Sequence, residues 1–250
     1  MWRKGLLIVG FALLLAVSWR TVATQTAGLP TLEPQEGIFV TPVPGQPFSA
    51  TVTTEVKREL KDGSIWQSVA TSLIARNSQG QIHNEAHAFL PVGLERRPTS
   101  TLLSVHIYDP QTRLNTYLNL NTHIARQSTL SREPATAPPA NWAQMDQRFR
   151  PSTNVQLEDL GTQTMEGFYV HGYRRTNTYD ARSTGTGRSI VVTDEYWYAE
   201  DMRLNLLEKH NDPRKGDFTT TVTEVNRTEP AGELFVVPAG FKTVDVTPQN

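Results

Sequence analysis

Residues 51–226 consist mostly of short runs rich in threonine, valine and aromatic residues, separated by turn sequences. The runs TVTTEVKREL and IWQSVATSLIAR flank the turn KDGS, and NSQG leads from the second run into QIHNEAHAF. A short connection containing glycine favours a β-hairpin. About ten such runs follow one another, and consecutive strands with short connections pair antiparallel. The pattern predicts a mainly β fold built as an antiparallel meander.

Apolar residues occupy both faces of several predicted strands. In SIVVTDEYWYA, Val192 and Tyr196 lie on one face, whereas Val191 and Trp197 lie on the other. A sheet with one solvated face alternates more strictly between apolar and polar positions. We therefore expect a single domain over residues 49–247, in which a curved, half-open β-barrel of about ten strands is covered on its concave side.

One interruption in the strand pattern, residues 131–151, combines a Pro-rich loop with a short helical pattern. Asn141 suits a helix N-cap, and Trp142, Met145 and Phe149 then fall on one face of the helix. Because two helical turns are not stable alone in water, we expect this helix to dock on the sheet. It would act either as a fixed part of the core or as a movable lid.

The first 48 residues predict export from the cytoplasm. Arg3 and Lys4 precede an apolar run of 13 residues, Gly5 to Val17, and small and polar residues follow, which is the order of a secretory signal peptide. Thirteen helical residues reach about 20 Å, short of the roughly 30 Å hydrocarbon core of a bilayer. We expect residues 1–23 to form a signal peptide, with a retained N-terminal anchor as the alternative. Residues 24–48 contain five prolines and predict an extended tether. The protein would then be periplasmic or secreted, or tethered to the membrane by an uncleaved N-terminus.

Composition excludes several classes of chemistry. The chain has no cysteine, so disulfides, thiol catalysis and cysteine-ligated zinc are ruled out. Without residues 1–23 it keeps 21 of its 24 basic residues against 25 acidic ones, a net charge of −4. That balance is not typical of a nucleic-acid-binding protein. The sequence also lacks the Gly-x-Ser-x-Gly motif of a nucleophile elbow. We predict no catalytic residue and no cofactor.

His83, Glu85 and His87 are the most conspicuous candidate metal ligands. On a strand these alternate residues share a face, but the two histidines lie about 13 Å apart along it. The spacing also differs from His-Glu-x-x-His, which requires a helix. We considered and rejected a metal site here, and we interpret the three residues as one solvated face of a strand.

The large apolar side chains suggest a different kind of site. Part of this apolar surface could line a cavity for a lipid-like ligand, with core packing as the alternative. The candidate lining residues are Trp66, Trp142, Met145, Phe149, Trp197 and Leu204.

Several motifs together resemble known families. LKDGS, RNSQGQIHNE, IYDPQTRLNTYLNL and LGTQTMEGFYVHGYRRT, within residues 51–245, resemble a family of uncharacterised exported bacterial proteins. The C-terminal half, with the Trp197 strand and the ending ELFVVPAGFKTVDV, resembles the periplasmic lipoprotein-carrier (LolA-like) superfamily. The resemblance implies a half-closed antiparallel β-barrel whose concave apolar face is covered by helices and binds acyl chains or lipoproteins. This chain departs from that pattern because it has no obvious N-terminal helix in its folded part.

The leading hypothesis is a non-enzymatic, exported cell-envelope protein that binds a lipid or lipoprotein acyl chain in the concave face of the sheet. The alternative is an envelope protein–protein interaction or sensor module without a ligand cavity, and a hydrolase is a minor alternative. The expected partners are a lipid, a lipoprotein or an envelope protein. We expect no nucleic acid, and membrane contact only through the N-terminal segment if it is not cleaved.

Overall fold

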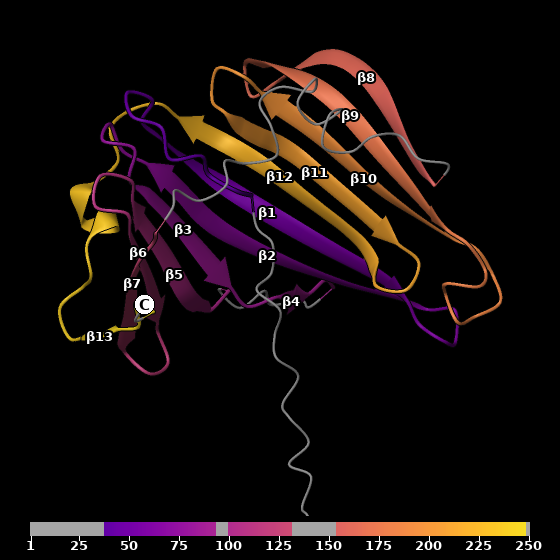
Figure 1. The fold of residues 1–250 in the computed structure, drawn as a ribbon, viewed down its shortest axis with the longest axis horizontal. Helices are drawn as coiled ribbons and strands as arrows, with labels where there is room; N and C mark the ends of the chain where they lie inside the picture. The colour runs from indigo at the N-terminus through magenta and orange to yellow at the C-terminus, as the bar shows by residue number, and fades with distance from the viewer. Residues whose placement is uncertain (1–37, 94–99, 132–153, 249–250) are drawn as a thin grey trace, which may run out of the picture. The chain divides into compact units, whose positions relative to one another are not determined.

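The computed structural model describes residues 38–93, 100–131 and 154–248. Within these ranges thirteen strands form one open sheet that is antiparallel except at one edge (Figure 1). The predicted mainly β, open antiparallel architecture is confirmed, with more strands than the ten expected. The strands of the first half are β1 (Phe48–Glu59), β2 (Ile65–Arg76), β3 (Ile82–His87), β4 (Leu90–Pro91), β5 (Leu102–Asp109), β6 (Leu114–Asn119) and β7 (Ile124–Thr129). Those of the second half are β8 (Val155–Met165), β9 (Phe168–Tyr179), β10 (Ile190–Ala199), β11 (Leu204–Asp212), β12 (Gly216–Asn226) and β13 (Lys242–Asp245).

The sheet is two meanders joined side by side. Strands β1, β2, β3, β5, β6 and β7 pair in chain order, and so do β8 to β12. The joint is the antiparallel pair β1–β12, in which Val52 lies opposite Val222. The short strand β4 pairs with β2 off this path, and β13 pairs parallel with β7. Strands β8 and β13 therefore lie at opposite ends of the strand order.

The main core lies on one face of this sheet. We call the face that carries Val52, Ile74 and Val222 the inner face. Val52 lies opposite Val222, and Ile74 lies opposite Ala50, which is two residues before Val52 and shares its face. A cluster of buried side chains gathers here: Ile38, Val40, Phe48, Ala50, Val52, Ile74, Ile82, Tyr108, Val170, Ala199, Met202, Leu204, Leu206 and Val222.

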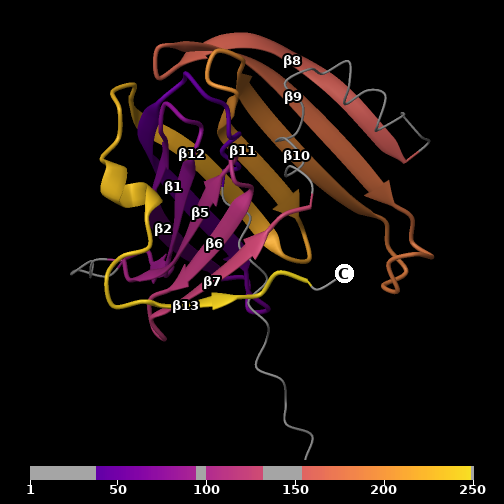
Figure 2. The same cartoon turned by 60° about the vertical axis from the view of Figure 1, so that its left-hand side comes forward.

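A second cluster lies on the opposite, outer face. It consists of Val105, Ile107, Leu118 and Ala125, with Val237 and Phe241 packed against it. The last two belong to the C-terminal segment (residues 232–246), which contains the 3₁₀ helix η1 (Gly232–Phe235) and runs to β13 beside β7 (Figure 2). One end of the sheet is thus covered on its outer face by the end of the described chain.

The segment before β1 also belongs to the folded part. Of the expected tether, residues 24–48, the described residues 38–47 instead pack on the sheet, since Ile38 and Val40 are fully buried in the main core. The signal sequence expected at residues 1–23 lies outside the described residues, and so do residues 132–151 of the expected loop and helix. Within the described ranges, no helix is long and apolar enough to cross a membrane.

Candidate functional site

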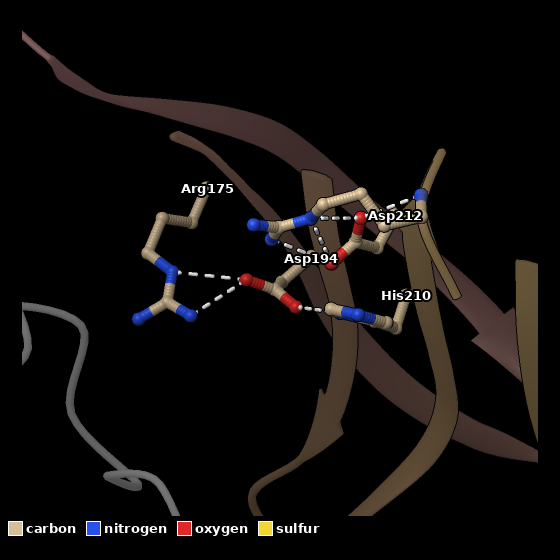
Figure 3. A network of polar contacts seen from close by, with 5 residues as sticks. Arg175, Asp194, His210 and Asp212 are labelled. Atoms are coloured by element: carbon tan, nitrogen blue, oxygen red, sulfur yellow. Dashed lines mark hydrogen bonds and ion pairs between the residues drawn. The ribbon is translucent and has the colours of Figure 1, made fainter. Parts of the chain in front are cut away.

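Strands β9, β10 and β11 place charged side chains in rows across the sheet. Asp194 lies opposite Arg175 on one side and His210 on the other. Arg175 donates to Asp194 Oδ2 from Nε at 3.1 Å and from Nη2 at 2.6 Å, while His210 Nδ1 lies 2.6 Å from Oδ1 (Figure 3). Burial lowers the pKa of Arg175, but the hydrogen bond and the charge of Asp194 raise it more. Both carboxylate oxygens are engaged, so Asp194 links three strands.

A second buried carboxylate, Asp212, closes the turn between β11 and β12 (Figure 3). Its oxygens accept hydrogen bonds from the backbone nitrogen of Arg214 at 2.9 Å and from Nη2 of the same residue at 2.8 Å. Hydrogen bonding to Arg214 holds the pKa of Asp212 below its usual value. The Arg214 guanidinium also lies 5.2 Å from the ring centre of Tyr179, at the end of β9. This contact joins the turn to the end of β9, across β10.

Glu195, one position along β10 and therefore on the opposite face of that strand from Asp194, binds three donors. Trp197 Nε1 at 2.8 Å and Lys209 Nζ at 3.0 Å donate to Oε1, and Arg174 Nη2 donates to Oε2 at 2.9 Å. Burial raises the pKa of Glu195, but the three hydrogen bonds outweigh burial and bring the pKa to about 2. Glu195 is therefore a charged acceptor at neutral pH and has no proton to donate.

A hollow of ≈ 340 Å³ lies beside Glu195. Its lining is polar and carries both signs of charge: Arg174, Thr193, Glu195, Lys209, His210, Asn211, Asp217, Phe218 and Thr219. Since Arg174 and Lys209 are already paired with Glu195, this hollow suits water or a small polar molecule. An acyl chain would leave these polar groups desolvated.

His83, Glu85 and His87 share a face, as their spacing predicts, but the face is not solvated. His83 is 5% exposed, and its Nδ1 lies 2.6 Å from the carbonyl oxygen of Leu234 in the C-terminal segment. The interpretation as a solvated face is wrong for His83, because residues far along the chain cover it. Glu85 lies between the histidines, with Oε1 3.4 Å from His83 Nε2 and Oε2 2.8 Å from His87 Nε2.

Among these three residues, Glu85 is a carboxylate paired with two histidines, and its pKa reflects that pairing. Burial raises the pKa of Glu85, but hydrogen bonds from His83 and His87 lower it further than burial raises it. Across the described residues, no group of three or more His, Asp or Glu side chains is arranged to hold a metal ion.

The candidate ligand-lining residues fall in different places. Leu204 is fully buried in the main core, and Trp197 packs against that core. Trp66 lies at the start of β2, 38% exposed and outside the cluster. Trp142, Met145 and Phe149 lie outside the described residues. The structure therefore brings Trp197 and Leu204 to one cluster and leaves Trp66 apart from it.

Sequence reasoning missed the charged rows on β9 to β11. It did not connect Arg174 and Arg175 with Asp194 and Glu195. A signal was present, because the sequences YRR and DEY lie on strands joined by one loop, where opposite charges can pair across a hairpin.

No protein-family model matches the chain, and no curated protein matches it. Similar solved structures include an uncharacterized conserved protein from Thermus thermophilus, with 14% identity, a TM-score of 0.41, and 80% of this chain and 91% of that chain covered. MucB in the Pseudomonas aeruginosa MucA/MucB complex has 14% identity and a TM-score of 0.39, with 80% and 59% covered, so this chain spans about three fifths of that one. A LolA superfamily protein from Nitrosomonas europaea has 8% identity and a TM-score of 0.31, with 78% and 91% covered. A LolA superfamily protein is thus among the similar solved structures.

Proposed function

We propose that this protein is a non-enzymatic binding protein of the cell envelope that holds a lipid or acyl chain on the inner face of its open sheet. The proposal rests on one observation, namely which part of the chain covers the main core. In the described part of the chain, Ile38 and Val40 cover the apolar inner face from an irregular segment, and no second sheet packs on it.

Ile38 and Val40 precede the part of this segment that Arg76 holds, at Thr41 and Gln46, so they can exchange with a ligand while that anchor stays in place. Residues 38–47 form no strand, and their backbone contacts include Val43 N to Thr41 O at 3.0 Å and Gly45 N to Ser78 O at 2.9 Å. An acyl chain in place of Ile38 and Val40 would recover apolar burial at about 0.8 kcal/mol per methylene. The apolar surface beneath, including Leu204 and Leu206, would stay out of water in both states.

The histidines support a binding role over hydrolysis. His106 is bonded to Asn115, His210 to Asp194, and His83 and His87 share Glu85. In the described ranges, no histidine is hydrogen-bonded to a serine or threonine hydroxyl, the arrangement that activates such a nucleophile.

Native mass spectrometry of the full chain, purified without detergent, tests the proposal, together with lipid extraction of the same sample. A stoichiometric lipid or acyl species, or uptake of added fatty acid or phospholipid, is the expected result. The variant Val40→Ala should take up ligand faster, and the exposed Tyr169→Ala should match the parent. A ligand-free mass that takes up neither fatty acid nor phospholipid would sink the proposal.

A protein partner is a second candidate, favoured by the outer edge of β8. In the described chain this strand pairs only with β9, and most of its residues are exposed or half-buried. An extended segment of another protein could add to such an edge. Photo-crosslinking in cells from the exposed Gln163 should then yield one envelope protein, and the variant Thr162→Pro should abolish the crosslink. If no specific crosslink forms at Gln163, this candidate is rejected.

A further inference from the structure

The turn between β1 and β2 exposes large apolar side chains at one end of the sheet. All residues from Lys57 to Trp66 are exposed, with Leu60 at 47%, Ile65 at 64% and Trp66 at 38%. Val92 is 40% exposed and lies alongside, because its backbone nitrogen donates to the carbonyl of Gln67 at 2.9 Å. We call residues 57–66 with Val92 the hairpin tip. Single exposed apolar residues are ordinary, but four gathered at one turn indicate a contact surface.

The hairpin tip contains a hydrogen-bonded turn that holds these side chains in place. Leu60 N donates to Ser64 O at 2.8 Å, and Gly63, with φ of 80°, donates to Leu60 O at 2.9 Å. Asp62 Oδ1 accepts from the backbone nitrogen of Ser64 at 3.0 Å and from its hydroxyl at 2.6 Å. These hydrogen bonds lie within the turn, so they do not depend on bulk water.

Basic side chains surround the apolar ones. Lys57, Arg58 and Lys61 lie within the tip, and in the described structure none of them forms an ion pair. The Arg58 guanidinium lies 5.8 Å from the ring centre of Trp66.

The turn between β11 and β12 lies next to the tip and adds no net charge to it. A Cβ at Gly216 would meet Lys57 and Arg58, so the two turns touch. Residues 57–66 hold three basic and two acidic side chains, and residues 212–217 hold two of each, so the two turns together carry a net charge of +1. One of the four carboxylates, Asp62, is already bonded within the turn.

From this arrangement we infer that the hairpin tip docks on a lipid bilayer that carries anionic headgroups. Leu60, Ile65 and Trp66 enter the interface between headgroups and acyl chains, where tryptophan is favoured. Lys57, Arg58 and Lys61 extend their charged ends to the phosphates while their aliphatic stems stay on the apolar surface. This contact is independent of any ligand on the inner face and of the N-terminal segment.

The lack of cysteine allows a local test on the full chain. A cysteine in place of Ile65 is labelled with the environment-sensitive fluorophore nitrobenzoxadiazole and mixed with vesicles of equal parts phosphatidylglycerol and phosphatidylethanolamine. We expect a blue shift and a several-fold rise in emission, and a much smaller change with phosphatidylcholine alone. Because the label reports only its own surroundings, membrane contact by residues 5–17 does not produce this signal.

The matched control places the same label at position 169 through Tyr169→Cys. Tyr169 is 81% exposed and lies near the start of β9, whereas the end of that strand, Tyr179, contacts the turn beside the tip. The label at position 169 should stay unchanged on vesicle addition. Equal shifts at both positions would show adsorption of the whole molecule and overturn the inference.

Charge reversal at the tip tests whether the fluorescence shift requires anionic lipid or arises from apolar contact alone. In the Ile65-labelled protein, Lys57→Glu with Lys61→Glu should abolish the shift on the anionic vesicles, since both residues are exposed and outside the core. If the shift persists, anionic recognition is disproved. In the protein labelled at position 65 without charge reversal, emission that changes with neither kind of vesicle would show that the tip does not bind a bilayer. This conclusion would hold whatever ligand native mass spectrometry finds on the inner face.

Discussion

Arg76 Nη2 donates a hydrogen bond to the carbonyl oxygen of Met202 at 3.0 Å, across 126 residues of sequence. The same fully buried guanidinium donates to the carbonyls of Thr41 at 2.7 Å and Gln46 at 2.8 Å. Burial, helped by the nearby charge of Arg203, lowers the pKa of Arg76 to about 10. One side chain from β2 therefore holds both the segment that covers the inner face and the turn between β10 and β11.

Replacing Arg76 with methionine should lower the free energy of unfolding by about 3 kcal/mol or more. Two buried carbonyls and one partly buried carbonyl would lose their donor, and each unsatisfied buried group costs about 1–3 kcal/mol. Urea unfolding followed by circular dichroism measures the change. The control Arg188→Met, at an exposed position, should stay within about 0.5 kcal/mol of the parent. Equal stability of the two variants would contradict the linking role of Arg76.

A second prediction concerns the close contact between Gly172 and Trp197, which are cross-strand partners on β9 and β10. A Cβ at position 172 would lie 2.6 Å from the indole ring, closer than packing allows. We expect Gly172→Ala to cost about 1–3 kcal/mol through overpacking and to change the tryptophan emission. Gly232→Ala is the matched control, because a Cβ there meets open space, and it should leave both stability and emission unchanged.

The local part of the fold could be predicted from the sequence, whereas the long-range part could not. The turn KDGS fixed the β1–β2 hairpin, since glycine and aspartate specify the connection between neighbouring strands. Nothing local specifies that Val52 faces Val222, because that pairing depends on which free edges remain after both meanders form. Strand β8 was missed because its sequence, VQLEDLGTQTM, is too polar for the apolar alternation used to find strands.

The candidate site shows the same limit. Alternation placed His83, Glu85 and His87 on one face, but only the tertiary fold brings Leu234 over that face. Likewise Ile38 looked like part of a Pro-rich tether, and its burial depends on an apolar surface assembled from β1, β2 and β11. The residue pattern within one strand predicts which side chains share a face. It does not predict which distant segment of the chain will cover that face.

The low pKa of Glu195 makes stability depend on pH in the acid range. Its pKa, about 2 in the folded protein, is depressed from an ordinary value of 4.5, so the folded state favours the charged form. This stabilisation is fully present above pH 4.5 and is lost as the pH falls toward 2. Because Arg174 and Lys209 are 38% and 49% exposed, we expect only about 1–2 kcal/mol after screening.

Urea unfolding of the parent and of Glu195→Gln at a series of pH values measures this contribution. The variant should be less stable at pH 7 and should lose less stability between pH 4.5 and 2. The control Glu233→Gln changes a carboxylate in the first turn of η1, and should keep the acid dependence of the parent. Parallel curves for the parent and Glu195→Gln would show that this carboxylate does not set the dependence.

His83 should control how firmly the C-terminal segment is held. Its ring contacts the Leu234 carbonyl and lies edge-on to Phe235, with ring centres 6.5 Å apart. His83→Ala removes one buried hydrogen bond, worth about 1–2 kcal/mol, while leaving the two apolar clusters intact. We expect the amides of Lys242 and Val246, which bond to β7 and the residue before it, to exchange with deuterium roughly tenfold faster. Amides in β1 should keep their protection, and the half-buried control His171→Ala should leave the exchange of Lys242 and Val246 unchanged, because its ring bonds to Asp159 and Tyr173 instead. Unchanged exchange at Lys242 would mean that β13 is held by its strand pairing alone.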